Sequence, residues 1–227
     1  MPKFFKASNK IEDVSSPKSS YISKSGFYPV TVLAPIVNVS KNGSTTVDFL
    51  VDYENQKQVI YGGLRCFNND GSQNAMGTKL FNQFLIVCGI EEVEDPIEMQ
   101  LPVGKKGAMK TVPVLEDAMD VETIMRIQLS YSMWDGEITE KRNIRGFYNA
   151  KNKASAEEML SGENIGSRYE QDSKYANDIT YEDGLTPEDI SKWIAGGRGK
   201  GRGENATKTQ TTAAPSFGKR RFGAATE

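Results

Sequence analysis

The chain has no histidine among its 227 residues. This absence excludes Ser-His-Asp and Cys-His nucleophilic catalysis, histidine-based general acid–base chemistry and the commonest metal ligand. An enzyme of this composition would have to work with carboxylates, lysine or tyrosine alone. We therefore expect a protein that is not an enzyme and that uses no cofactor or metal.

Cysteine is scarce and long hydrophobic runs are missing. Cys66 and Cys88 are the two cysteines, and without a CxxC pair or a histidine they indicate free thiols rather than a zinc site. No window approaches 18 consecutive apolar residues, which argues against a membrane span. The first twenty residues also lack the apolar centre of a signal peptide, so we expect a cytoplasmic protein.

Charge is distributed unevenly along the chain. The net charge is −2, from 28 basic and 30 acidic residues. Residues 195–227 have seven of the basic and two of the acidic residues, which leaves 21 basic and 28 acidic residues for the rest. An acidic body with a basic tail predicts that any contact with a polyanion is local.

The clearest pattern is a three-strand meander over residues 26–61. Asn42-Gly43 is a strong hairpin signal, and residues 45–54 alternate apolar and polar side chains as a half-buried strand does. Pro29 and Pro35 indicate that the first strand is bent or partly at an edge. A short third strand at residues 57–61 leads into an expected loop at residues 62–71.

The rest of the body is expected to contain one helix and further hairpins. Residues 74–88 have apolar side chains at helical spacing, and Gly89 stands where a helix C-cap glycine belongs. Residues 101–110 are interpreted as the tip of a hairpin whose second limb is residues 110–115. Asp135-Gly136 then joins an alternating strand at residues 123–134 to a partner at residues 137–148.

This order of elements predicts an all-β fold with one inserted helix. We expect residues 25–149 to form an OB-fold-like five-stranded Greek-key barrel, whose helix lies between the third and fourth strands. A two-sheet sandwich and a generic α+β domain are the alternatives. Residues 1–24 are expected to be a flexible arm, residues 150–195 an extension with short helices, and residues 196–227 a disordered Gly-, Arg- and Lys-rich tail.

The segment from Gly26 to Gly89, with GFYPVTV, SKNGS, VDFLVDYE, IYGGL and LFNQFLIVCG, resembles bacteriophage-type single-stranded DNA-binding proteins of OB-fold architecture. The Trp-Asp-Gly hairpin at residues 134–136 is in keeping with that resemblance. The resemblance implies protection of single-stranded DNA in phage-type replication, recombination or repair, in the host cytoplasm if the protein is viral. Replication or recombination proteins and an oligomeric assembly are compatible with it. The chain departs from the family at its end, GKRRFGAATE, where such proteins often have an acidic tail.

Binding single strands without sequence preference needs a basic groove for phosphates and aromatic faces for bases. One set of candidates lies on the expected non-core face of the last hairpin: Arg126, Trp134, Lys141, Arg145 and Phe147. A second set lies in the turns and near the end of the third strand: Lys41, Tyr61, Arg65, Phe67, Lys105, Lys106 and Lys110. The tail adds Arg198, Lys200 and Arg202 between glycines. For Trp134 the competing interpretation is packing under the C-terminal extension.

Two other functions fit parts of the sequence. A non-enzymatic β-barrel adaptor that binds proteins and not nucleic acid agrees with the acidic body. A carboxylate–metal nuclease would use Asp48 and Asp52 on one strand face, or the acidic residues at 116–120. Carboxylates in such positions are more often solvated, so the nuclease is the weakest of the three hypotheses.

Overall fold

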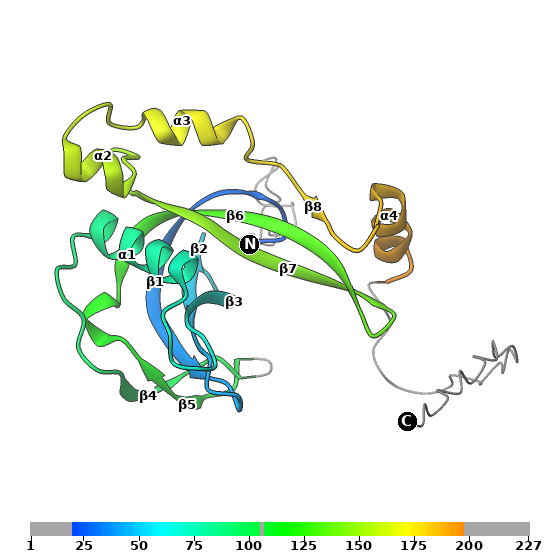
Figure 1. The fold of residues 1–227 in the computed structure, drawn as a ribbon, viewed down its shortest axis with the longest axis horizontal. Coiled ribbons are helices and arrows are strands. Elements are labelled where there is room, and N and C mark those ends of the chain that lie inside the picture. The colour runs from blue at the N-terminus through cyan, green and yellow to red at the C-terminus, as the bar shows by residue number, and fades with distance from the viewer. Residues whose placement is uncertain (1–19, 105–106, 198–227) are drawn as a thin grey trace, which may run out of the picture.

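The computed structural model describes residues 20–104 and 107–197. This part of the protein is mostly β-sheet, with eight strands and a few helices (Figure 1). Neighbouring strands are antiparallel, except that the two-residue strand β8 (Thr180–Tyr181) runs parallel to β6 (Val121–Trp134). The expectation of a mainly β protein with some helices is confirmed.

The first three strands form the expected meander. β1 (Gly26–Val39) pairs with β2 (Thr45–Tyr53), which pairs with β3 (Gln56–Phe67). β3 continues to Phe67 through the segment that the sequence had indicated as a loop. The continuation is possible because extra residues at Gly62-Gly63 are absorbed as a bulge, since Ile60 pairs with Phe49 and Leu64 with Val47.

The helix α1 (Ala75–Cys88) follows β3, as predicted. Its N-cap Asn74 accepts a hydrogen bond from the Gly77 amide, and Gly89 ends the helix in the left-handed conformation at φ 72°. A short antiparallel pair comes next, β4 (Ile97–Leu101) with β5 (Lys110–Val114), followed by the 3-10 turn Glu116–Ala118. This pair covers part of the outer face of the meander with a second small apolar cluster.

The long hairpin of β6 and β7 (Glu137–Asn149) completes the sheet. β6 pairs with the first half of β1, and the far end of the hairpin extends well beyond the other strands (Figure 1). β7 also contacts β3, but the two strands are not hydrogen-bonded partners. The sheet is therefore not closed.

Three phenylalanines from distant parts of the chain form the centre of the main core. Phe49 of β2, Phe84 of α1 and Phe147 of β7 have ring centroids 5.2–5.6 Å apart. Valine, isoleucine and methionine side chains from β1, β2 and β6 surround them. The core thus joins the meander, the helix and the late hairpin through apolar burial.

Phe147 corrects one of the sequence-based predictions. It was expected on the outer face of β7, but it is 2% exposed and lies in the core. The reason is a one-residue bulge, because Arg126 pairs with Gly146 whereas the next residue, Ile127, pairs with Ile144. Arg145 is the extra residue, so strict alternation fails there and every later side chain of β7 changes face.

The C-terminal extension runs along the hairpin as α2 (Ala156–Ser161), α3 (Ser167–Ser173), β8 and α4 (Pro187–Ala195) (Figure 1). α4 begins with a capping box, in which the Thr186 side chain accepts from the Asp189 amide, and Pro187 is the first helical residue. α3 has no apolar stripe in its seven residues, and it is held by the ion pairs of Asp172 and by the ring of Tyr169, which packs against Phe27 and Tyr148.

Phe147→Ala tests the corrected placement. Removing a fully buried ring from this core is expected to lower the free energy of unfolding by about 3–5 kcal/mol, measured by urea denaturation. Phe67→Ala is the matched control, because Phe67 is 40% exposed and its truncation should cost about 1 kcal/mol or less. Equal losses for the two variants would contradict the placement of Phe147 in the core.

Candidate functional site

A strip of exposed aromatic and basic side chains follows the outer face of β3. Tyr61 is 58% exposed and Phe67 is 40% exposed, and Arg65 between them is exposed as well. The three share a face because the alternate residues Ile60, Leu64 and Cys66 point into the core. Three residues of the second predicted set therefore lie together on one strand.

The bulge at Gly62-Gly63 separates Tyr61 from Arg65 and depends on a close approach of backbones. A Cβ on Gly63 would lie 2.0 Å from the carbonyl oxygen of Val47, so only glycine fits there. The Gly63 amide donates to Asp48 Oδ1 at 3.0 Å, and Asn38 Nδ2 donates to Asp48 Oδ2 at 3.0 Å. Burial raises the pKa of Asp48 despite these hydrogen bonds. The Asp48 carboxylate is therefore a structural group that joins β1, β2 and the bulge of β3.

A turn with an exposed lysine lies near one end of the strip, and the segment leading into the β4–β5 loop contacts the other end. The β1–β2 turn with exposed Lys41 packs near Asn69, two residues beyond Phe67. At the other end, the Tyr61 hydroxyl donates to the carbonyl oxygen of Val103 at 3.3 Å, next to the β4–β5 loop. Lys110 of β5 is exposed. Two predicted residues of that loop, Lys105 and Lys106, lie outside the described residues, as do Arg198, Lys200 and Arg202 of the tail.

The first predicted set does not form one surface. Trp134 is 76% exposed at the tip of the β6–β7 hairpin, and Lys141 and Arg145 are exposed along β7. The C-terminal extension covers Tyr131 through Trp193 of α4 and leaves Trp134 uncovered. Phe147, as described above, is in the core.

Arg126 is not a free cation. Its side chain is 15% exposed and pairs with Asp172 of α3 at 3.1 Å. The same carboxylate accepts from Arg168 Nε at 3.1 Å and from the Tyr148 hydroxyl at 2.5 Å. Burial, reinforced by the neighbouring Asp172 carboxylate, raises the pKa of Tyr148. Arg126 therefore holds α3 on the hairpin. The prediction that Arg126 faces solvent as a DNA-binding cation is wrong.

Glu158 organises the loop between α2 and α3. Its Oε1 accepts from the Arg168 amide at 2.7 Å and from Ser167 Oγ at 2.8 Å. Its Oε2 accepts from the amides of Ser155 at 2.8 Å and Gly166 at 3.2 Å. Burial alone would raise the pKa of Glu158, but these hydrogen bonds outweigh it and hold the pKa at about 2.

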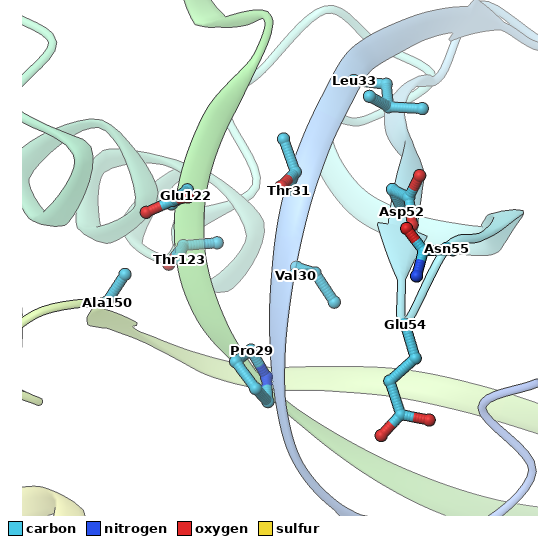
Figure 2. Close-up of a pocket in the computed structure, with 10 residues that line it drawn as sticks. All are labelled: Pro29, Val30, Thr31, Leu33, Asp52, Glu54, Asn55, Glu122, Thr123 and Ala150. Carbon is cyan, nitrogen blue, oxygen red and sulfur yellow. The ribbon is translucent and has the colours of Figure 1, made fainter. Parts of the chain in front are cut away.

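An open pocket of about 530 Å³ lies across β1, β6 and the β2–β3 turn. Its lining includes Asp52, Glu54 and Glu122, which would repel a polyanion. Figure 2 shows the carboxylates of Glu54 and Glu122 pointing away from each other. Across residues 20–104 and 107–197, no three Asp, Glu or Cys side chains are placed to hold a metal ion.

No protein-family model and no curated protein sequence matches the chain. In the part of the chain that the structure describes, no helix is long and apolar enough to cross a membrane.

Lys79 of α1 and Arg168 of α3 were not among the predicted residues, although the fold brings both next to Arg145. In the sequence they look like any other solvated basic side chain. Their only sequence signal is charge, and Lys79 lies 66 positions before Arg145 in the chain. Lys79 and Arg168 differ from other exposed basic residues because the fold places them in one cleft with Arg145.

Glu158→Gln is expected to make stability less dependent on pH. Because folding lowers the pKa of Glu158 from its usual 4.5 to about 2, its contribution is complete above about pH 4.5 and is lost as the pH falls toward 2. Urea denaturation at a series of pH values should show the wild type and Glu158→Gln converging at low pH. Glu163→Gln, at an exposed carboxylate nearby, is the control; a wild-type advantage over Glu158→Gln that does not change with pH would contradict the assignment.

Proposed function

We propose that the protein binds single-stranded DNA without sequence preference. In this proposal bases stack on Tyr61 and Phe67, and phosphates contact Arg65 and the flanking lysines. The supporting observation is the strip on β3, where two exposed rings and an exposed guanidinium share one face. Stacking on an aromatic ring tolerates any base, because every base has a π-face.

The arrangement of the strands supports the proposal that the body is a variant of the OB-fold. β1 pairs with β2 and β6, and at Ile36 with β5; without the β4–β5 pair, the strand order is β3-β2-β1-β6-β7. α1 lies between the third and fourth strands of that set, and β3 contacts β7 where a barrel would close. The β4–β5 pair is then an insertion. OB-folds bind oligonucleotides on the face of their second and third strands, which is where the strip lies.

The charge distribution agrees with local binding. Within the described residues, Arg65, Lys41 and Lys110 form no ion pair, whereas Arg126 and Arg168 are paired with Asp172. The acidic pocket near Glu54 and Glu122 lies across β1, β6 and the β2–β3 turn. None of the strip residues Tyr61, Arg65 and Phe67 lines it. An acidic protein can therefore present a cationic surface to DNA over a short range.

The proposed biological role is the one that the family resemblance implies. The protein would cover single strands that are exposed during phage-type DNA replication, recombination or repair, and it would not act as an enzyme. Protection of this kind needs affinity without sequence readout, because the exposed strand has no fixed sequence. Stacking and phosphate contacts supply that affinity.

Tyr61→Ala and Phe67→Ala test the stacking strip. Each variant should raise the Kd for oligo-dT by roughly 5- to 150-fold, which corresponds to about 1–3 kcal/mol per lost stack. Fluorescence anisotropy with a labelled oligonucleotide at low salt is the measurement. Tyr175→Ala is the control, because Tyr175 is a comparably exposed ring on the C-terminal extension, at 57%.

An unchanged Kd in both strip variants would contradict the assignment of the strip. If the wild type itself fails to bind oligo-dT at low salt, the DNA-binding proposal is wrong. A β-barrel that binds proteins would then be the better hypothesis.

The tail supplies a separate prediction. Deleting residues 196–227 removes seven basic and two acidic residues and is expected to weaken oligo-dT binding and flatten its dependence on salt. The physical reason is that each phosphate neutralised on a single strand contributes about 0.7 to the slope of log Kobs against log salt. The same affinity and slope in the truncated protein would show that the tail does not contact DNA.

A further inference from the structure

A small cleft of about 150 Å³ lies where α1, β7 and the α2–α3 segment meet. Three cations from three different elements line it: Lys79 of α1, Arg145 of β7 and Arg168 of α3. Figure 1 shows why they can meet, because α2 and α3 lie close to the end of the β6–β7 hairpin that is next to α1. The lining is mainly polar and includes Ser155 and Gln83, so the cleft suits a small oxyanion and not an apolar ligand.

The bulge in β7 is the reason that Arg145 faces this cleft. Arg145 is the residue left without a partner between the pairs Arg126–Gly146 and Ile127–Ile144. Bulges of this kind redirect a side chain and often occur beside functional sites. The bulge therefore turns Phe147 into the core and leaves a cation on the opposite surface.

Both arginines are held through one nitrogen and keep others for a ligand. Arg145 Nε donates to Gln128 Oε1 at 2.7 Å, and Arg168 Nε donates to Asp172 Oδ2 at 3.1 Å. A guanidinium has five N–H donors in a fixed planar fork. The terminal nitrogens of Arg145 make no hydrogen bond with another described residue. Anchoring through Nε reduces the side-chain entropy that a ligand contact would otherwise cost.

Two carboxylates also line the cleft, and they do not cancel its charge. Asp172 is neutralised by Arg126, whose half-buried guanidinium lies 3.1 Å from it, as well as by Arg168. Glu157 is exposed, so water screens it strongly. Lys79 is exposed and forms no ion pair among residues 20–104 and 107–197. The balance in the cleft is positive.

We infer that this cleft binds a phosphate group. Arginine forks match the geometry of phosphate oxygens and bind them through paired, charge-assisted hydrogen bonds. The phosphate has two possible sources: a phosphodiester of a bound DNA strand, or a free phosphate or phosphorylated small molecule. The first source rests on the proposed DNA-binding function, whereas the second does not.

The strand source is tested by the salt dependence of oligo-dT binding. Lys79→Gln, Arg145→Gln and Arg168→Gln each remove one cation, and Lys192→Gln on the exposed surface of α4 is the control. Each contact that is lost should reduce the slope of log Kobs against log salt by about 0.7. Tyr61→Ala should reduce affinity and leave this slope unchanged, which separates the cleft from the stacking strip.

The free source is tested by thermal unfolding in inorganic phosphate against chloride at equal ionic strength. Phosphate should raise the Tm of the wild type, and Arg145→Gln and Lys79→Gln should lose that shift while Lys192→Gln keeps it. Reduced slopes identify a strand phosphodiester, and a phosphate-dependent Tm identifies the free ligand. If neither changes, the cleft binds no phosphate. If the wild type binds no oligo-dT but its Tm responds to phosphate, the proposed function fails and the cleft assignment stands.

Discussion

The fold depends on a single long strand that pairs along both of its edges. Residues 26–32 of β1 pair with β6, and residues 31–39 pair with β2. The exchange of partners falls at an irregularity at Leu33, between Val32 and Ala34, where the register with β2 shifts. Pro29 and Pro35 fit this strand although proline has no amide donor, because neither half of β1 is fully paired on both sides. β1 thereby joins the N-terminal meander to a hairpin about a hundred residues later.

Two further irregularities decide which side chains reach the surface. The Gly62-Gly63 bulge allows β3 to continue past Tyr61, so Arg65 and Phe67 extend the strip that Tyr61 begins. The Arg145 bulge reverses the faces of the last part of β7, so Phe147 packs against Phe49 and Phe84. Both proposed binding surfaces therefore lie next to a break in the regular ladder, as is common for functional sites.

Acidic side chains of this protein make structural contacts, whereas basic side chains are exposed at the two proposed binding surfaces. Asp172 and Glu158 are enclosed by donors and hold the C-terminal extension in place, and the pKa of Glu158 stays at about 2 because its carboxylate accepts four hydrogen bonds. The Asp48 carboxylate likewise accepts a hydrogen bond from the Gly63 amide in the bulge of β3. Several acidic groups are therefore occupied by structural contacts, and the net charge of −2 says little about the potential at the strip on β3 or at the Arg145 cleft.

The sequence alone determined the elements whose signals are local. The Asn-Gly and Asp-Gly turns and the end of α1 at Gly89 depend on neighbours within a few residues, and the structure has each of them. The half-buried alternation expected for β2 is not reproduced, because residues 47–51 are all buried. Tertiary structure decided the rest. The bulge at Arg145 is set by pairing across the hairpin, α3 is held by an ion pair to a strand about 46 residues away, and Lys79 meets Arg145 only in the folded chain. Periodicity identifies a buried face along one element, but contacts between distant elements decide which exposed charges act together.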